Sequence, residues 1–538
     1  MKHRAFLFLF TFVLLLPTLL GETVLWDDTY LVSTWDRNDP FLLVEYFDKL
    51  GMPWQGWLHY YLSFLPYKVT FYKLFSVLSW SACSVLAYQL LAAVPFFTPR
   101  DRFYIALIAS LFPGFNLWFS IIQMPQPLYV AIFLAGCYAY WQGSMNRKWL
   151  LKTVGLLLIL PTFALQSLYV YLYGLIFVWF WFTKDVENGF LNSAFQFTKQ
   201  HLAIILLPVI QFMLLKVFFP IDPIFGTYNV MQFDKAPFKL LVSLGVPPLF
   251  ILREAWNVFT KDWQLFVGLL AMSLIFVKAA LVIVKPAKLR GGENKSQWRN
   301  IIAAGIFLAI CGVFPYALVN KPYLGINYTG RFAMLLAWPV SLILYGLIRY
   351  RFDSSRQLVQ KLITIVCVVF CFLTFKDQVL WHTRYIKYIA MTRQIEGEED
   401  KMLPLVFFND QTTIGKPAPL IYFELNWIMN RAWNNPDHFG FSSFQNHVNK
   451  QMMFEELEQI HYFKNLKNSF FQELMLFSKK GGEYNREAAT LITVRNGQFD
   501  SNLRLWLKWI SGSNETKRKI TESLIEIEIK NLENHSDG

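Results

Sequence analysis

Long apolar segments recur along most of this chain and limit what it can fold into. Of its 538 residues, 55% are hydrophobic and only 16% are charged, whereas about a quarter of the residues in a water-soluble domain are charged. A helix of about 20 apolar residues is long enough to cross the hydrocarbon core of a bilayer. We therefore expect an integral membrane protein.

Apolar segments follow one another from the N-terminus to about residue 378. The first follows Lys2, His3 and Arg4, and its end supplies only one of the small residues that a signal-peptidase site requires, so we interpret it as an uncleaved helix. The expected spans number about eleven and cover 5–21, 69–96, 104–122, 125–142, 149–166, 167–183, 202–220, 264–284, 300–319, 331–349 and 361–378. Residues 238–258 are interrupted by Pro247, Pro248 and Arg253, which favours an interfacial or re-entrant helix. If that segment spans instead, every later loop changes side.

The basic residues alternate between loops in a way that predicts orientation, because Lys and Arg accumulate in cytoplasmic loops. With the N-terminus inside, the cytoplasmic loops contain Arg100, Arg102, Arg147, Lys148, Lys152, Lys184, Lys199, Lys285, Lys288, Arg290, Lys295, Arg299, Arg349, Arg351, Arg356 and Lys361. The opposite loops are poorer in basic residues. We therefore expect a protein of the plasma or inner membrane with a cytoplasmic N-terminus, a first outer loop at about 22–68 and an extracytoplasmic C-terminal region.

The composition changes after about residue 379. Short apolar stretches such as 403–408 and 491–494 alternate there with hydrophilic runs, which is typical of a small folded domain. The predicted fold class is thus an all-α polytopic membrane domain over 1–378 and a small extracytoplasmic α+β domain over 379–538. The polar end of the chain is expected to form a mobile tail.

The first outer loop carries the strongest candidate site. Asp27 and Asp28 directly follow the first apolar segment, and carboxylates beside a hydrophobic slab are costly unless water, a cation or a substrate receives them. A carboxylate can also act as a general base or hold a divalent cation such as Mg²⁺ or Mn²⁺. We expect Asp27 and Asp28 to be catalytic and consider them tentative metal ligands.

Four further residues of this loop are candidates for binding substrate: Trp26, Tyr30, Trp57 and His59. Aromatic rings stack on the apolar faces of sugars, although Trp near the end of a span is also an ordinary interface anchor. In the same way, Asp28 could simply cap the helix that follows it. Residues 39–50 have apolar residues at helical spacing and predict an amphipathic helix on the membrane surface.

A second outer stretch, residues 320–332, contains Lys321, Tyr328, Gly330 and Arg331. Arg331 can make a bidentate contact with phosphate, and Tyr328 is a companion for substrate binding. An Arg at the head of a span is equally often a membrane anchor.

The acidic pair after the first span, the long outer loop, the many further spans and the polar C-terminal region together resemble the GT-C class of membrane glycosyltransferases. Within that class the chain is similar to bacterial enzymes that add glucose to surface polysaccharide. The resemblance implies transfer of a sugar from a polyprenyl-phosphate donor to a glycan or lipid acceptor on the extracytoplasmic face. It also implies that Asp27 or Asp28 is the base and that Arg331 contacts the donor phosphate.

Two readings from other classes remain open. A polysaccharide or lipid transporter would need polar residues along a path through the spans, and charges inside the spans are few, with Lys73 and Lys216 near helix ends. A noncatalytic scaffold of envelope assembly would use the C-terminal region for docking. Nucleic acid is not an expected partner, because no basic patch with stacking aromatics stands apart from the apolar segments.

Overall fold

The computed structural model divides the chain into two compact units. A membrane unit contains residues 1–20 and 44–376, and a C-terminal unit contains residues 21–43 and 377–538. The structure describes residues 2–20, 23–25, 28–36, 38–115, 118–184, 189–221, 230–284, 295–324, 327–353, 355–403, 405–415, 420, 422–433, 438–442 and 488–533.

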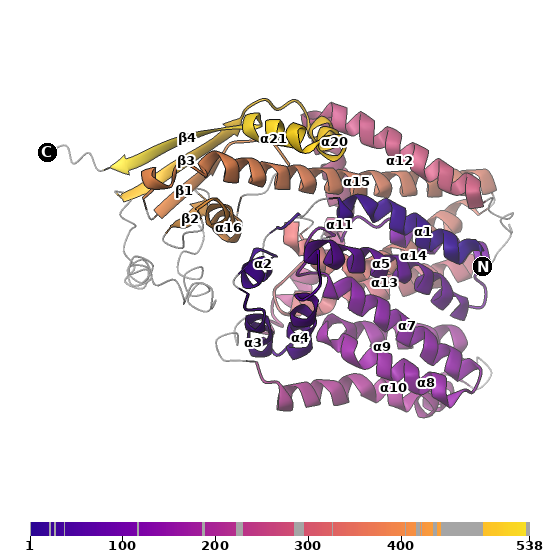
Figure 1. Cartoon of the computed structure of the whole chain (residues 1–538). Helices are drawn as coiled ribbons and strands as arrows, with labels where there is room; N and C mark the ends of the chain where they lie inside the picture. The colour runs from indigo at the N-terminus through magenta and orange to yellow at the C-terminus, as the bar shows by residue number, and fades with distance from the viewer. Residues whose placement is uncertain are drawn as a thin grey trace. The chain divides into compact units, whose positions relative to one another are not determined.

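The membrane unit is built from helices (Figure 1). Its α-helices are α1 (Lys2–Leu15), α4 (Pro53–Leu62), α5 (Lys68–Leu90), α6 (Pro99–Ser110), α7 (Pro125–Met145), α8 (Trp149–Ile159), α9 (Ser167–Thr183), α10 (Phe190–Phe218), α11 (Ala236–Lys261), α12 (Trp263–Val284), α13 (Lys295–Leu318) and α14 (Ala337–Phe352), with most of α3 (Phe41–Lys49) and the first half of α15 (Arg356–Ile395). Short 3₁₀ helices extend several of them: η1 (Leu16–Leu19), η2 (Leu91–Ala93), η3 (Leu160–Ala164) and η5 (Asn327–Leu336).

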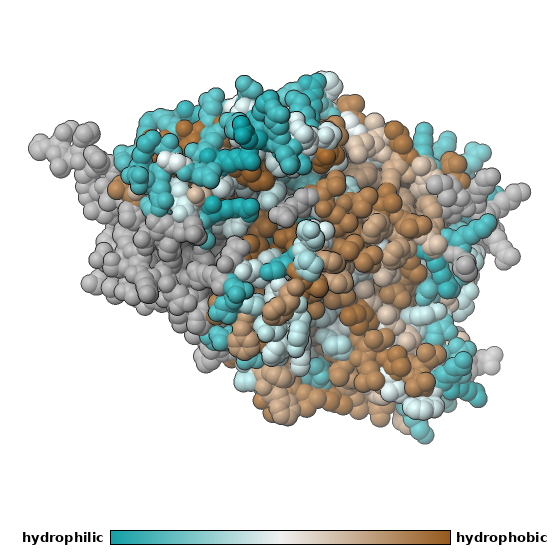
Figure 2. Space-filling model, viewed as in Figure 1, coloured by the Kyte–Doolittle hydropathy of each residue, from teal (hydrophilic) through white to brown (hydrophobic). Residues whose placement is uncertain are grey.

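Seven helices in the described part of the chain are long and apolar enough to cross a membrane. They cover Lys2–Leu19, Lys68–Ala93, Phe190–Phe218, Trp263–Val282, Lys295–Leu318, Thr329–Phe352 and Arg356–Ile395. Their exposed side chains include many apolar residues, such as Val209, Met213 and Ile275. Figure 2 shows hydrophobic residues gathered over the surface of these helices, as expected for a surface that faces lipid.

Three expected segments differ in detail from the observed helices. The expected span 104–122 is not one continuous helix, because α6 ends at Ser110, shortly before Pro113 and Gly114. In α10 the backbone leaves helical geometry at His201 (φ −118°, ψ 18°), directly before the expected span 202–220. The interrupted segment 238–258 lies within one helix, α11, whose Glu254 is 2.5 Å from the buried ammonium of Lys376 on α15.

A buried charge cluster brings together three loops that the charge pattern assigns to one side. Asp101, at the start of α6, accepts a hydrogen bond from Arg349 near the end of α14 at 3.0 Å. The guanidinium of Arg349 also lies 4.6 Å from the ring of Trp298, at the start of α13. Asp353 completes the cluster at 2.8 Å from Arg349. The first turns of α6 and α13 and the last turn of α14 therefore meet at the same end of the bundle.

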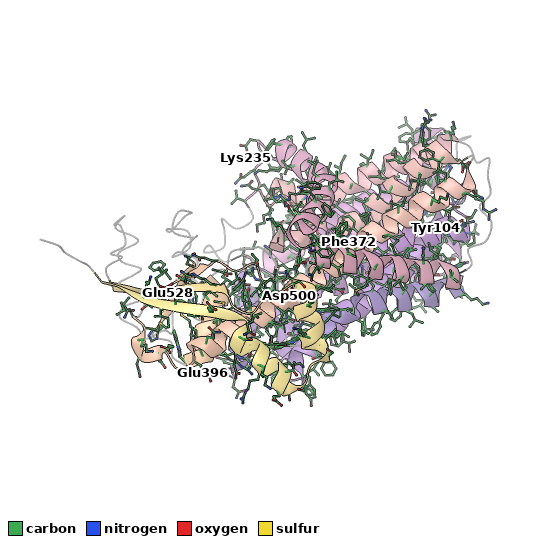
Figure 3. The ribbon with its side chains drawn as sticks, turned by 90° about the horizontal axis from the view of Figure 1, so that it is seen from above. Tyr104, Lys235, Phe372, Glu396, Asp500 and Glu528 are labelled. Carbon is green, nitrogen blue, oxygen red and sulfur yellow. The ribbon has the colours of Figure 1, made fainter. Side chains whose placement is uncertain are left out.

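The C-terminal unit contains a four-stranded sheet in the order β2-β1-β3-β4 (Figure 1). Its elements are α2 (Asp28–Asp36), the second half of α15, η6 (Glu399–Lys401), β1 (Leu405–Asp410), α16 (Tyr422–Trp433), β2 (Phe439–Ser442), β3 (Ala488–Asn496), α20 (Asn502–Ser511), α21 (Asn514–Ser523) and β4 (Ile525–Glu533). β1 pairs in parallel with β2 and β3, and β4 closes one edge antiparallel to β3. Figure 3 labels Glu396 after α15, Asp500 before α20 and Glu528 on β4.

The last described residues of this unit form a helix and a strand, and the expected mobile tail falls on the residues after them. Residues 514–533 form α21 and β4, and β4 is the edge partner of β3 along its whole length. The alternating apolar residues Ile525, Ile527 and Ile529 give β4 the period-two pattern of a half-buried strand. Residues 534–538 lie outside the described part of the chain.

Candidate functional site

Asp28 lies at the N-terminus of α2, and its side chain is fully buried. The backbone N–H of Leu25 donates a hydrogen bond to Oδ2 of Asp28 at 3.2 Å. A buried carboxylate is stable only when hydrogen-bond donors or cations surround it. Within the same unit α2 packs against α16. The structure thus holds Asp28 as a fixed, desolvated carboxylate a few residues after the first apolar helix.

Three neighbouring predictions fall on residues that the structure covers only partly. Trp26 and Asp27 lie outside the described residues, so the acidic pair is seen through Asp28 alone. Tyr30 belongs to α2 by its backbone, but its side chain lies outside the described part. The same holds for Tyr328, whose backbone is the second residue of η5.

His59 is packed inside the membrane unit, where it contacts two aromatic rings. It lies on α4, with ring centroids 5.1 Å from Phe47 and 5.6 Å from Tyr72. Nδ1 of His59 is 3.0 Å from the hydroxyl of Tyr72. Burial lowers the pKa of His59 to about 3, so the imidazole is neutral at physiological pH. In the structure described, His59 is held between these two aromatic rings and by the hydroxyl of Tyr72.

Trp57, on the same helix, is 41% exposed and forms an aromatic surface with its neighbours. Its ring stacks on Tyr61 at 5.9 Å and meets Tyr60 edge-on at 5.5 Å. Phe64 and Tyr67 continue the exposed aromatic surface beyond α4. Such a group suits either the membrane interface or the apolar face of a sugar ring.

Arg331 and Lys321 form a cationic pair beyond the end of α13. The guanidinium of Arg331, on η5, lies 4.9 Å from the ring of Phe332, and that ring is 4.7 Å from Tyr316. The backbone N–H of Lys321 donates to the carbonyl oxygen of Tyr316 at 2.8 Å. Burial, with a smaller contribution from Arg331, lowers the pKa of Lys321 to about 7. An anion bound next to Arg331 and Lys321 would offset the repulsion that Arg331 exerts on the Lys321 ammonium.

Lys73 is a further buried cation of the membrane unit. It lies on α5, its side chain is 1% exposed, and its ammonium is 5.9 Å from the ring centroid of Phe119. The sequence marks it only as a charge near a helix end, because its burial depends on how the segment after α6 packs.

Two groups of residues in the membrane unit include positions predicted from the sequence. One is the aromatic surface around Trp57 on α4, and the other is the cationic pair of Lys321 and Arg331.

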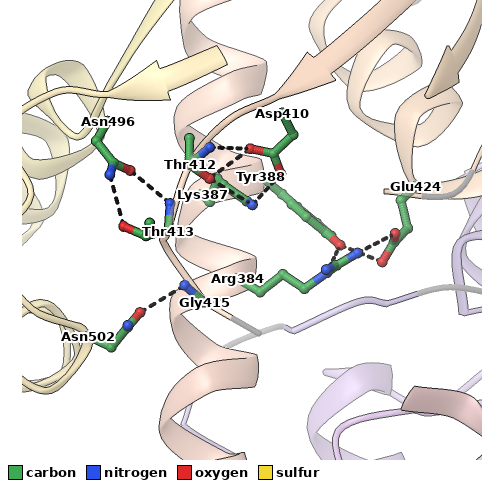
Figure 4. Close-up of polar contacts among 10 residues, drawn as sticks. All are labelled: Arg384, Lys387, Tyr388, Asp410, Thr412, Thr413, Gly415, Glu424, Asn496 and Asn502. Carbon is green, nitrogen blue, oxygen red and sulfur yellow. Dashed lines mark hydrogen bonds and ion pairs between the residues drawn. The ribbon is translucent and has the colours of Figure 1, made fainter. Parts of the chain in front are cut away.

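A second polar cluster lies in the C-terminal unit and was not predicted (Figure 4). Arg384 on α15 and Glu424 on α16 are fully buried and form an ion pair at 2.8 Å. The hydroxyl of Tyr388 bonds to Glu424 and also contacts Arg384. One turn along α15, the ammonium of Lys387 is 2.6 Å from Asp410 and 3.1 Å from Thr412.

The loop after β1 is fixed by this cluster. Asp410 ends β1 and accepts hydrogen bonds from the backbone and the hydroxyl of Thr412. Burial opposes the charged form of Asp410, but Lys387 and Thr412 outweigh burial and hold the pKa of Asp410 below its usual value. Asn496 accepts from the N–H of Thr413, and Asn502 accepts from the N–H of Gly415. Because these charges pair with each other, the cluster primarily holds α15 against β1 and α16.

The sequence contains two signals for this cluster. Asp410 comes two residues after the apolar run 405–408, as a residue at the carboxyl end of a strand does. Arg384 and Lys387 are spaced to share one face of a helix. Neither signal identifies Glu424 as the partner of Arg384, because the contact between α16 and α15 is made in the folded structure and has no counterpart in the local sequence.

Within the described residues, no group of three or more His, Cys, Asp or Glu side chains is arranged to hold a metal ion. Asp27, one of the two tentative ligands, lies outside that part. No model of a known protein family matches the chain, and a search of curated proteins gives no significant match.

Proposed function

We propose that this chain is an integral-membrane glycosyltransferase of the GT-C type. It would move a sugar from a polyprenyl-phosphate donor to an envelope glycan or lipid acceptor. The observation that carries the proposal is the buried carboxylate of Asp28, held a few residues after the first apolar helix in a chain rich in helices able to span a membrane. In this proposal the chain crosses the membrane about eleven times. The crossings are made by the seven long helices and by α7, α9, the α8–η3 segment and the region of α6. The N-terminus is cytoplasmic, and the C-terminal unit is extracytoplasmic.

The reaction needs a base next to the acceptor hydroxyl. Asp28 or Asp27 takes the proton of that hydroxyl as its oxygen bonds to the anomeric carbon of the donor sugar. The bond between the anomeric carbon and the phosphate oxygen breaks at the same time, and the polyprenyl phosphate leaves with the electron pair. Attack opposite to the leaving group inverts the configuration of the sugar.

The leaving phosphate needs positive charge. Lys321 and Arg331 supply it in this proposal, and binding of the phosphate dianion would favour the protonated form of Lys321. A Mg²⁺ or Mn²⁺ ion held by Asp27 and Asp28 is the alternative source of charge.

The test is transfer from a synthetic polyprenyl-phosphate sugar by purified protein in detergent. Loss of a general base reduces rates by 10²- to 10⁴-fold, so we expect Asp28→Asn or Asp27→Asn to lower turnover by at least about 100-fold. Asp39→Asn is the matched control, because Asp39 is exposed in the same loop. Near wild-type turnover in both the Asp27 and Asp28 variants would exclude the assigned base.

A further inference from the structure

The membrane unit contains an apolar cavity that the proposed reaction does not use. Its volume is about 160 Å³, and its lining comes mainly from α5, α7, α9, α13 and α14. The lining is apolar and aromatic, and it includes Leu134, Cys137, Trp179, Ala304 and Trp338. An apolar cavity of about 150 Å³ in a protein stays free of water and binds hydrocarbon instead. The chemistry of the wall therefore selects a hydrocarbon occupant.

Two aromatic pairs connect α7 and α9 at the cavity. Phe133 of α7 lies 6.4 Å from Tyr171 of α9, and two turns further along α7, Tyr140 lies 6.4 Å from Trp179. His201, at the irregular point of α10, is 3.3 Å from the hydroxyl of Tyr140. Tyr140, Tyr171 and Trp179 also line the cavity, so its wall between these helices is largely aromatic.

The sequence at the ends of α7 and α9 beyond the cavity has an excess of basic residues. From residue 143 to residue 201 it contains Arg147, Lys148, Lys152, Lys184 and Lys199 against two acidic residues, Asp185 and Glu187. The ammonium of Lys184 lies 3.7 Å from the ring of Trp181, near the end of α9. Basic residues near a bilayer surface attract anionic lipid headgroups.

We propose that this cavity binds a hydrocarbon chain of an anionic phospholipid, with the headgroup among these basic residues. The site is separate from the anion site proposed for the sugar donor. On α13 the cavity is lined by Ile301, Ala304 and Leu308, whereas Lys321 follows the opposite end of that helix. At 1.5 Å per residue, Ala304 and Leu318 are about 21 Å apart along the helix axis. The phosphate of the sugar donor at Lys321 and the phospholipid headgroup beside Lys184 therefore belong to two different lipid molecules.

Photo-crosslinking tests the proposal with full-length protein in mixed micelles. The probe is phosphatidylglycerol that carries a diazirine in one acyl chain. We expect crosslinks in the peptides that contain 134–141 and 171–182. Ala304→Phe fills the cavity and should reduce them at least fivefold, whereas Ala303→Phe, on the exposed side of the same helix, should leave them unchanged.

The headgroup is tested separately, with variants that leave the cavity intact. Lys148→Gln combined with Lys184→Gln should weaken labelling by phosphatidylglycerol, and phosphatidylcholine with the same chain should label the wild type several-fold less. Equal labelling of the Ala304→Phe and Ala303→Phe variants would overturn the cavity as the site. Stronger labelling by a polyprenyl-phosphate probe, or equal labelling by the choline lipid, would overturn the anionic phospholipid as its occupant. Sugar transfer does not enter either readout.

Discussion

His59 is a titratable residue whose protonation opposes folding. Burial lowers its pKa to about 3, whereas an unfolded histidine titrates near 6.5. Between these values the unfolded chain binds a proton that the folded chain does not, so stability falls as pH decreases below about 6.5. From pH 7 to pH 5 the expected loss is about 2 kcal/mol in the free energy of unfolding.

Thermal unfolding in detergent at several pH values measures this effect. His59→Phe keeps an aromatic ring between Phe47 and Tyr72 but cannot titrate, so its stability should fall less over the same range. Tyr72→Phe removes the hydrogen bond to His59 and should retain the pH dependence. If wild type and His59→Phe lose equal stability, His59 is not the titrating group.

Lys321 provides the corresponding prediction for binding. Its pKa is lowered to about 7 by burial and by Arg331, so the empty site loses its ammonium charge as pH rises through neutrality. If the donor phosphate binds here, its affinity should decrease between pH 6.5 and 8.5. Lys321→Arg should remove this dependence, because a guanidinium stays protonated over the whole range. Donor affinity measured by titration across this range is the test, and an unchanged slope in the Lys321→Arg variant contradicts the assignment.

A candidate functional residue can be predicted from the sequence where its neighbours along the chain mark it. Asp28 and Arg331 stand out because each follows or precedes an apolar run. The neutral state of His59 is not readable in this way, because it depends on Phe47 and Tyr72, which reach it from α3 and α5. The same reason hides the pairing of Arg384 with Glu424, which are 40 residues apart.

At the scale of elements, α15 has two different halves in one helix. Its 40 residues correspond to about 60 Å at 1.5 Å per residue. Residues 362–375 are free of charge, as the expected span 361–378 required, but the helix continues to Ile395 with buried charges. A hydropathy scan ends the apolar segment near the first charged residues. It cannot show that the helix continues beyond them, or that β1 and α16 bury its charged second half.

The buried pair of Arg384 and Glu424 gives a prediction about that half. Removing one partner leaves an uncompensated buried charge, which costs about 3–5 kcal/mol. We expect Arg384→Met and Glu424→Leu each to destabilise the C-terminal unit strongly, and the double variant to lose less than the sum. The exposed pair of Arg518 and Glu522 is the control, where Arg518→Met should cost less than about 1 kcal/mol. Additive losses in a double-mutant cycle followed by thermal unfolding would show that the two buried residues do not act as a pair.

At the scale of the whole molecule, the sequence predicts a helical membrane protein with a small α+β region after about residue 379, and the structure has a small sheet there, but the order of its strands is not predicted. The loops around Asp101, Trp298 and Arg349 were assigned to one side from their basic residues, and these residues meet in the structure. The order β2-β1-β3-β4 could not be derived in this way, because β1 and β3 are more than 70 residues apart and pair through their backbones. Similarly, residues 21–43 belong to the C-terminal unit although they are remote from it in sequence.

The proposed orientation can be tested on the intact cell. Lys148 precedes α8 at the basic helix ends, and Glu515 is an exposed residue of α21 in the C-terminal unit. If basic loops face the cytoplasm, a membrane-impermeant maleimide should label Glu515→Cys but not Lys148→Cys until the membrane is permeabilised. The five native cysteines lie in apolar helices, and four of them are buried, so the wild type serves as the blank. Labelling of Lys148→Cys alone in intact cells would invert the topology. It would then put the C-terminal unit in the cytoplasm, on the opposite side from the proposed extracytoplasmic transfer.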